Sequence, residues 1–179
     1  MVWIEREWRA ELVARHPLLF HPDAGKSCGM PGHPICGPGW RDILDRCCIR
    51  ISALLWTDDR FRFLEIREER GSVQFEWRCS LPAGAQRLLH RAIALAEARS
   101  LTTCEVCGDV GRLHVNDGWH ATRCAVHATG QLVQTRPGDD DLHMVQETGG
   151  ANGSVLVARY DRATDSLVYL PPGSRGIKG

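Results

Sequence analysis

The sequence predicts an α+β fold in which helices pack on a small antiparallel sheet, completed by a metal-binding module and a C-terminal β-hairpin. Two segments with helical spacing of apolar residues, 40–56 and 86–99, enclose two β-prone segments, 60–66 and 73–79. Four of the six cysteine and histidine residues between 104 and 127 then occur as two close pairs. We therefore divide the chain into a helical and β-hairpin core (1–100), a metal module (101–130), a polar acidic linker or loop (131–153), and a β-hairpin with a tail (154–179).

The composition favours one main domain without a charge-driven partner. The chain has 179 residues, and its 22 Lys and Arg residues balance its 22 Asp and Glu residues. No global charge excess therefore attracts it to nucleic acid or to an anionic membrane. No apolar run approaches the length of a membrane span, and charged residues rather than an apolar signal segment occupy the start. We expect a location in the reducing cytoplasm, where the cysteines bind metal or lie buried.

The first forty residues predict one helix and one long loop. Trp8 and Leu12 lie on the apolar face of a helix over residues 2–15, and Trp8 is expected to pack on the core. Prolines and glycines between 16 and 39 prevent a long helix or strand. This loop holds Cys28, His33 and Cys36, whose spacing matches no established ligand pattern. A second metal site there stays open, although we favour loop residues without a ligand role.

The central part of the chain predicts a helix, a β-hairpin and a second helix. Cys47 lies on the apolar face of the helix over 40–56 and is expected to be a small core residue. In the second strand Phe75 and Trp77 alternate with polar residues, so they are expected to face the helices. Gly71 is available for the turn between the strands. The second helix, over 86–99, leads directly to the first metal-binding turn.

The spacing from 104 to 127 predicts a closed metal site. Its ligands are Cys104, Cys107, Cys124 and His127, in the order Cys-x2-Cys and Cys-x2-His. Two such pairs, joined by a short hairpin that turns at Asn116-Asp117-Gly118, are typical of a tetrahedral Cys3His zinc ribbon. Because four protein ligands leave no position for substrate or water, we expect one structural Zn²⁺.

Four segments that occur in order between about Cys36 and His127 carry a resemblance. They are CGPGWRDILDRCC, EIREERGSVQFEW, AEARSLTTCEVCGDVGRL and GWHATRCAVH. This pattern resembles a group of uncharacterised small zinc-ribbon proteins of bacteria, which are often encoded near prophages and other mobile elements. The resemblance implies the same order of helix, hairpin, helix and zinc ribbon, and no catalytic residue. The chain departs from the group at Arg70-Gly71-Ser72, where relatives tend to have basic and aromatic residues.

The last fifty residues lie outside the resemblance. Residues 130–153 are polar and glycine-rich, with an acidic run at Asp139 to Asp141, and are expected to form a linker or a long loop. Residues 154–170 alternate as two strands around a turn. Such a hairpin does not stand alone, so we expect it to join the main sheet or a partner. Residues 171–179 have the composition of a flexible tail.

Three functions are compatible with these features. We favour a non-enzymatic zinc-binding protein that acts by protein–protein interaction, such as an immunity protein that neutralises a toxin, or an inhibitor encoded by a phage or mobile element. The alternative is a nucleic-acid-binding zinc ribbon that uses Arg112, Trp119 and Arg123. A zinc-knuckle nuclease would use His114, Asn116 and His120, but the sixteen residues between the knuckles leave little room for its catalytic unit.

Overall fold

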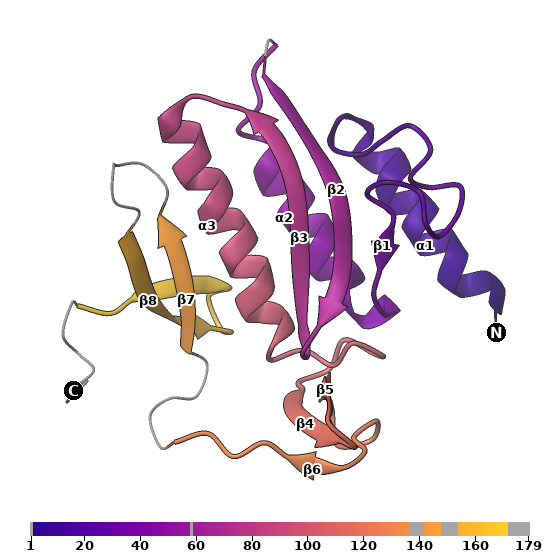
Figure 1. The fold of residues 1–179 in the computed structure, drawn as a ribbon, viewed down its shortest axis with the longest axis vertical. Helices are drawn as coiled ribbons and strands as arrows, with labels where there is room; N and C mark the ends of the chain where they lie inside the picture. Colours follow the sequence, from indigo (N-terminus) through magenta and orange to yellow (C-terminus); the bar gives the residue numbers. More distant parts are fainter. Residues whose placement is uncertain (1, 58, 137–141, 148–153, 172–179) are drawn as a thin grey trace.

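The computed structural model describes residues 2–57, 59–136, 142–147 and 154–171. This described part is a mixed α+β fold with three α-helices and three small sheets (Figure 1). The helices are α1 (Val2–Arg15), α2 (Arg41–Ser52) and α3 (Ala83–Ser100), with short 3-10 turns η1 (Pro17–Leu19) and η2 (Pro38–Trp40). The fold class that the sequence predicts is therefore present in its general form.

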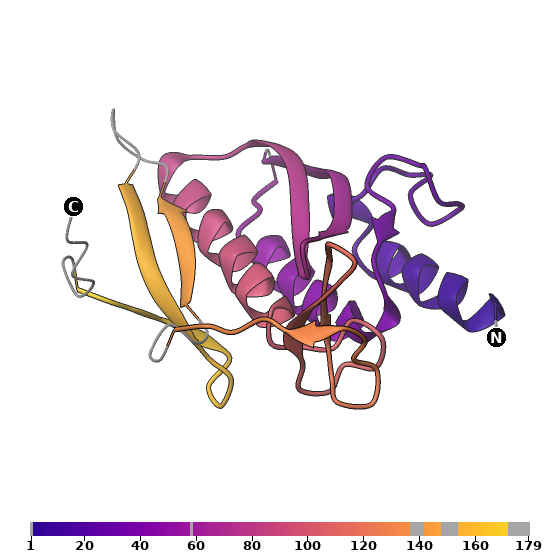
Figure 2. The same cartoon turned by 60° about the horizontal axis from the view of Figure 1, so that its bottom comes forward.

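The central sheet has the strand order β1-β2-β3. Strands β2 (Arg60–Glu69) and β3 (Ser72–Ser80) form the predicted hairpin, and β1 (Pro34–Ile35) pairs in parallel with β2. Helices α2 and α3 lie beneath one face of this sheet (Figure 2). The core between them includes Trp40, Ile43, Phe63, Ile66 and Leu89, each at most 1% exposed. Phe75 is buried and Trp77 is half-buried, and both pack on this core as predicted.

The helices agree with the sequence prediction except at their ends. Trp8 is buried in the core cluster, so the expected packing of α1 is confirmed. Helix α2 ends at Ser52, before the predicted end at 56, because the chain there must turn toward β2 and the last turns tighten. Trp56 is consequently 83% exposed. Helix α3 begins at Ala83, directly after Pro82, earlier than predicted.

The segment predicted as a linker contains two strands. Strand β6 (Gln131–Leu132) pairs with the metal module, and β7 (Leu142–Glu147) pairs with β8 (Ser154–Asp161). Strand β9 (Ser166–Tyr169) completes a third sheet of order β7-β8-β9. The assignment of 131–153 to a linker or loop is therefore wrong for these two strands. Strands β8 and β9 pair with each other and do not extend the central sheet.

Helix α3 explains where the third sheet packs. Val145 and Ala158 are fully buried against Ala94, on a face of α3 that the central sheet does not cover. The acidic run Asp139 to Asp141 and residues 172–179 lie outside the described residues. None of the described helices is both long enough and apolar enough to cross a membrane.

Candidate metal centre

The four predicted ligands meet in one cluster. Their ligand atoms all lie within 4.8 Å of one another. The Sγ atoms of Cys107 and Cys124 are 3.7 Å apart, and His127 Nδ1 is 3.7 Å from Cys104 Sγ and 3.2 Å from Cys124 Sγ. Bond lengths of zinc to sulfur and nitrogen in a tetrahedral site imply about 3.8 Å between sulfurs and about 3.6 Å between sulfur and nitrogen. The cluster could therefore hold a metal ion, and Nδ1 is the nitrogen of His127 that lies next to the sulfurs.

Two tight turns and one hairpin bring the ligands together. In the first turn the Gly108 N–H donates to Cys104 O at 2.8 Å, and Gly108 has the positive φ of 86° that glycine adopts freely. Strands β4 (Arg112–Asn116) and β5 (Trp119–Arg123) then pair through the predicted turn. The hairpin returns the chain to Cys124, and the His127 N–H donates to Cys124 O at 3.1 Å.

The thiols of Cys104 and Cys107 have different pKa values when no cation is close. Burial opposes ionisation of Cys104, but backbone N–H groups of Cys124, Cys107 and Val106 outweigh it and lower the pKa of Cys104 to about 6. The Asp109 N–H lowers the pKa of Cys107, yet burial, the Cys124 sulfur and the Asp109 carboxylate together raise it to about 12. A divalent cation compensates the charge of neighbouring thiolates, so metal binding here would release protons from this cluster.

The segment Cys36 to Trp40 attaches the first metal-binding turn to the core. The Gly39 N–H donates to Glu105 O, and the Gly37 N–H donates to Glu105 Oε1, both at 2.8 Å. The buried Trp40 Nε1–H donates to Thr103 O at 2.8 Å. A Cβ at Gly39 would lie 2.5 Å from Gly108 N, so the two backbones touch. The segment CGPGW thus packs against the first metal-binding turn and holds it in place. Sequence reasoning missed this role.

Strand β5, the second strand of the hairpin in the metal module, also contacts the core. Thr122, which is fully buried, donates its hydroxyl to Gly71 O at 2.7 Å and accepts the Glu105 N–H at its carbonyl. Gly71 belongs to the turn between β2 and β3 and has a φ of 82°. A side chain at Gly71 would collide with Leu113. The metal module and the central hairpin therefore share a packed interface.

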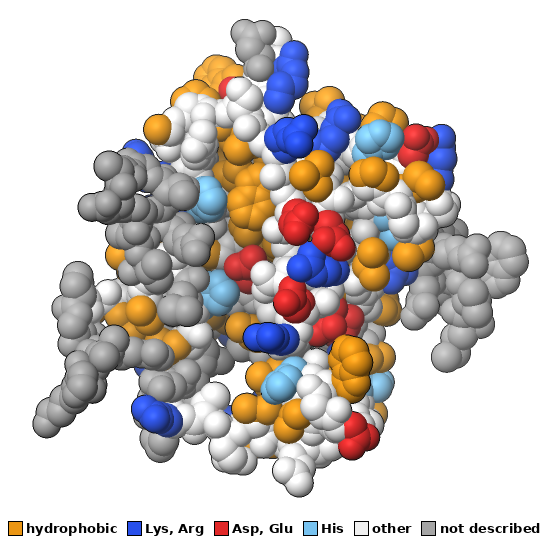
Figure 3. Space-filling view, viewed as in Figure 1, with side chains coloured by type: hydrophobic (Ala, Val, Ile, Leu, Met, Phe, Trp, Pro, Cys, Tyr) orange, Lys and Arg blue, Asp and Glu red, His pale blue; other side chains and the backbone are white. Residues whose placement is uncertain are grey.

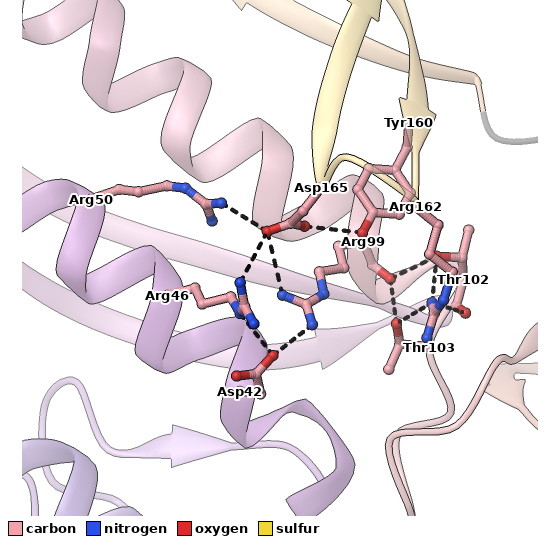
Figure 4. A network of polar contacts seen from close by, with 9 residues as sticks. All are labelled: Asp42, Arg46, Arg50, Arg99, Thr102, Thr103, Tyr160, Arg162 and Asp165. Carbon is pink, nitrogen blue, oxygen red and sulfur yellow. Dashed lines mark hydrogen bonds and ion pairs between the residues drawn. The ribbon is translucent and has the colours of Figure 1, made fainter.

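The turn between β8 and β9 reaches the same region from the other side (Figure 4). Arg162 donates to Thr102 O at 2.9 Å and to Thr103 Oγ1 at 3.1 Å, just before the first ligand. Asp165 accepts hydrogen bonds from Arg50 at 2.8 Å and from the Tyr160 hydroxyl at 3.0 Å. The third sheet is therefore joined to the start of the metal module and to α2.

The geometry argues against the nuclease assignment of residues in the hairpin. The register pairs His114 with Ala121 and Val115 with His120, so the two histidines lie on opposite faces of the two strands. Both are separate from the four-ligand cluster, and His114 Nδ1 lies 2.8 Å from Arg112 O. Arg123, one of the candidate nucleic-acid contacts, instead pairs with Glu105 at 2.7 Å.

The other cysteines and histidines considered as ligands are dispersed. Cys28 is exposed, whereas Cys36 is buried and burial raises its pKa to about 12. His33 Nδ1 lies 2.7 Å from Ala24 O. Within the described residues, only the Cys104, Cys107, Cys124 and His127 cluster has ligand geometry. Cys47 is fully buried in the core, as predicted, and burial raises its pKa to about 12.

No family model, curated protein or solved structure matches this chain. The resemblance to prophage-associated zinc-ribbon proteins therefore stays a prediction, and the function must be argued from the site itself.

Proposed function

We propose that the chain is a non-enzymatic protein that holds one structural Zn²⁺ and acts by binding another protein. Three thiolates and one imidazole are donors that zinc favours, and the four ligand atoms lie close enough together to share one ion. Four protein ligands fill the coordination sphere, which leaves no position for a substrate. This closed donor set is the observation that carries the proposal, because it favours a structural over a catalytic metal.

The metal module presents apolar side chains to solvent. Trp119 is 81% exposed at the hairpin, and Val126, between the last two ligands, is 85% exposed. Val106 in the first turn is 42% exposed. Protein interfaces are enriched in tryptophan, whereas a nucleic-acid surface needs clustered Lys and Arg. We therefore assign the exposed part of this module to a protein partner, such as a toxin that it neutralises or a host factor that it inhibits.

The test is affinity capture with matched variants. The full chain is used to capture proteins from its native host, and Trp119→Ser and Val126→Ser are compared with the wild type. The control is Val168→Ser, which changes a 52% exposed valine on β9. We expect the two module variants to lose the partner while zinc content and thermal stability stay unchanged, and the control to retain it.

Two results would contradict the proposal. One is the absence of any stable partner for the wild-type chain. The other is salt-sensitive binding of DNA or RNA with an affinity that depends on Trp119, which would instead identify a nucleic-acid-binding protein.

A further inference from the structure

Strand β3 lies at the edge of the central sheet. It is nine residues long, and among the described residues only β2 pairs with it. The Val73 N–H donates to Ser100 Oγ at 2.9 Å, so the groups of Val73 point away from β2. Because backbone groups alternate along a strand, the N–H and C=O groups of Phe75, Trp77 and Cys79 also point away from β2. Long edges of this kind are sites of strand addition.

The edge of β3 lies next to helix α3. Helix α3 passes beside β3 on the side away from β2, with β7 beyond it (Figure 1). The half-buried Trp77 ring meets His90 of α3 edge-on, with 5.5 Å between the ring centres. A strand added to β3 would therefore place every second side chain toward Trp77 and His90, where apolar residues fit best.

The outer face of β2 and β3 carries like charges in bands. Arg62 lies directly opposite Arg78, and neither has an acidic partner among the described residues. Glu65 lies directly opposite Glu76, and Arg67 pairs closely with Glu65 at 2.5 Å but only loosely with Glu76, at 3.8 Å. Charged side chains of both signs lie close together on this face (Figure 3). Like charges directly opposite each other are destabilising, so Arg78 favours an acidic residue on an added strand. Glu76 has only the long contact with Arg67, so it favours a basic residue there.

We propose that the β3 edge binds an extended segment of a partner protein, which adds as an antiparallel strand. This inference rests on the proposed function and names the surface and chemistry of one contact. The segment carries an acidic residue opposite Arg78 and, two residues later, a basic residue opposite Glu76, with an apolar residue between them. Residues 76 and 78 would occupy the closer, non-hydrogen-bonded pairs of the new ladder, where side chains interact most strongly.

Two blocked peptides test the charge pattern. Both alternate valine with threonine, and at their centre one has Glu-Val-Lys and the other Lys-Val-Glu. They are titrated into the full zinc-loaded chain and into the double variant Glu76→Arg with Arg78→Glu. We expect the wild type to prefer the Glu-Val-Lys peptide by at least about tenfold and the double variant to reverse that preference. The double variant places opposite charges across from Arg62 and Glu65, so it should fold.

Hydrogen exchange locates the contact. The Glu-Val-Lys peptide should slow amide exchange at Phe75, Trp77 and Cys79, and should leave Glu76 and Arg78, whose N–H groups face β2, unchanged. The proposal is wrong if neither peptide binds in the millimolar range, if both proteins bind both peptides equally, or if protection appears elsewhere.

Partner capture separates this proposal from the proposed function. If the double variant still captures the wild-type partner and the peptides do not bind, the edge assignment fails while partner binding stands. If the wild type captures no partner, the proposed function fails, and the peptide titrations alone decide whether the edge accepts a strand.

Discussion

Replacing Gly39 by alanine tests whether the CGPGW segment supports the metal centre. The added Cβ would lie 2.5 Å from Gly108 N and 2.7 Å from Glu105 O, and closer still to Cys104 O. Real Cβ atoms do not approach backbone atoms so closely, so the segment and the metal turn must separate. Overpacking costs typically 1–3 kcal/mol. Loss of the hydrogen bond from Gly39 N–H to Glu105 O adds about 0.5–1.5 kcal/mol.

We therefore expect Gly39→Ala to lower the free energy of unfolding by about 2–4 kcal/mol, or the melting temperature by roughly 5–15 °C. Zinc affinity should fall by at least about tenfold, because the displaced turn carries two ligands. Denaturant titration of the zinc-loaded protein measures the first effect, and competition with a chelator measures the second.

The matched control is Gly84→Ala. Gly84 lies in the first turn of α3, and nothing lies within 4 Å of the position of its added Cβ. Alanine is the better helix former, so stability should stay the same or rise by up to about 1 kcal/mol. Wild-type stability and zinc affinity in Gly39→Ala would refute the contact between the segment and the metal turn.

Two further predictions concern the metal and the third sheet. Metal analysis should find one zinc per chain. The variants Cys104→Ala and Cys124→Ala should lose both the zinc and the folded state of residues 101–130. A wild-type chain without zinc would contradict the assignment of a zinc site. Burial opposes ionisation of Asp165, but the hydrogen bond from Arg50 and the charge of Arg99 prevail and lower its pKa. Its stabilising effect is therefore full above the ordinary carboxyl pKa and is lost as the pH falls through the lower folded value. Asp165→Asn should cost about 1–3 kcal/mol near neutral pH and flatten the acid side of the stability profile; an unchanged profile in denaturant titrations would contradict this.

Sequence periodicity predicted the elements that have one buried face. The helices α1, α2 and α3 and the β2–β3 hairpin follow from the spacing of their apolar residues. The four candidate metal ligands could also be identified from the sequence, because their spacing alone is typical of a metal site, and the structure brings them together. Both kinds of pattern are local in the sequence and need no knowledge of the partner element.

The third sheet, and the packing of the CGPGW segment against the first metal-binding turn, could not be predicted in this way. Strand β7 is short and lies between polar stretches, and Val145 becomes buried only because Ala94 offers it a surface. Gly39 is adapted to an approach from Gly108, which is far away in the sequence. Proline and glycine around Gly39 indicated a loop, and local propensity gives no information about what touches a loop.

The contacts around the metal module argue that it is not an independent domain. Thr103 O accepts from Trp40, Thr122 donates to Gly71, and Arg162 reaches Thr102 from the third sheet. Metal binding that orders this module must therefore also stabilise the end of α3, the β2–β3 turn and the β8–β9 turn. A zinc ribbon tethered by a flexible linker would leave the core unaffected when zinc is removed. If the cluster binds zinc as proposed, chelation should shift the unfolding of the central hairpin too, because the metal would then stabilise three parts of the chain rather than one.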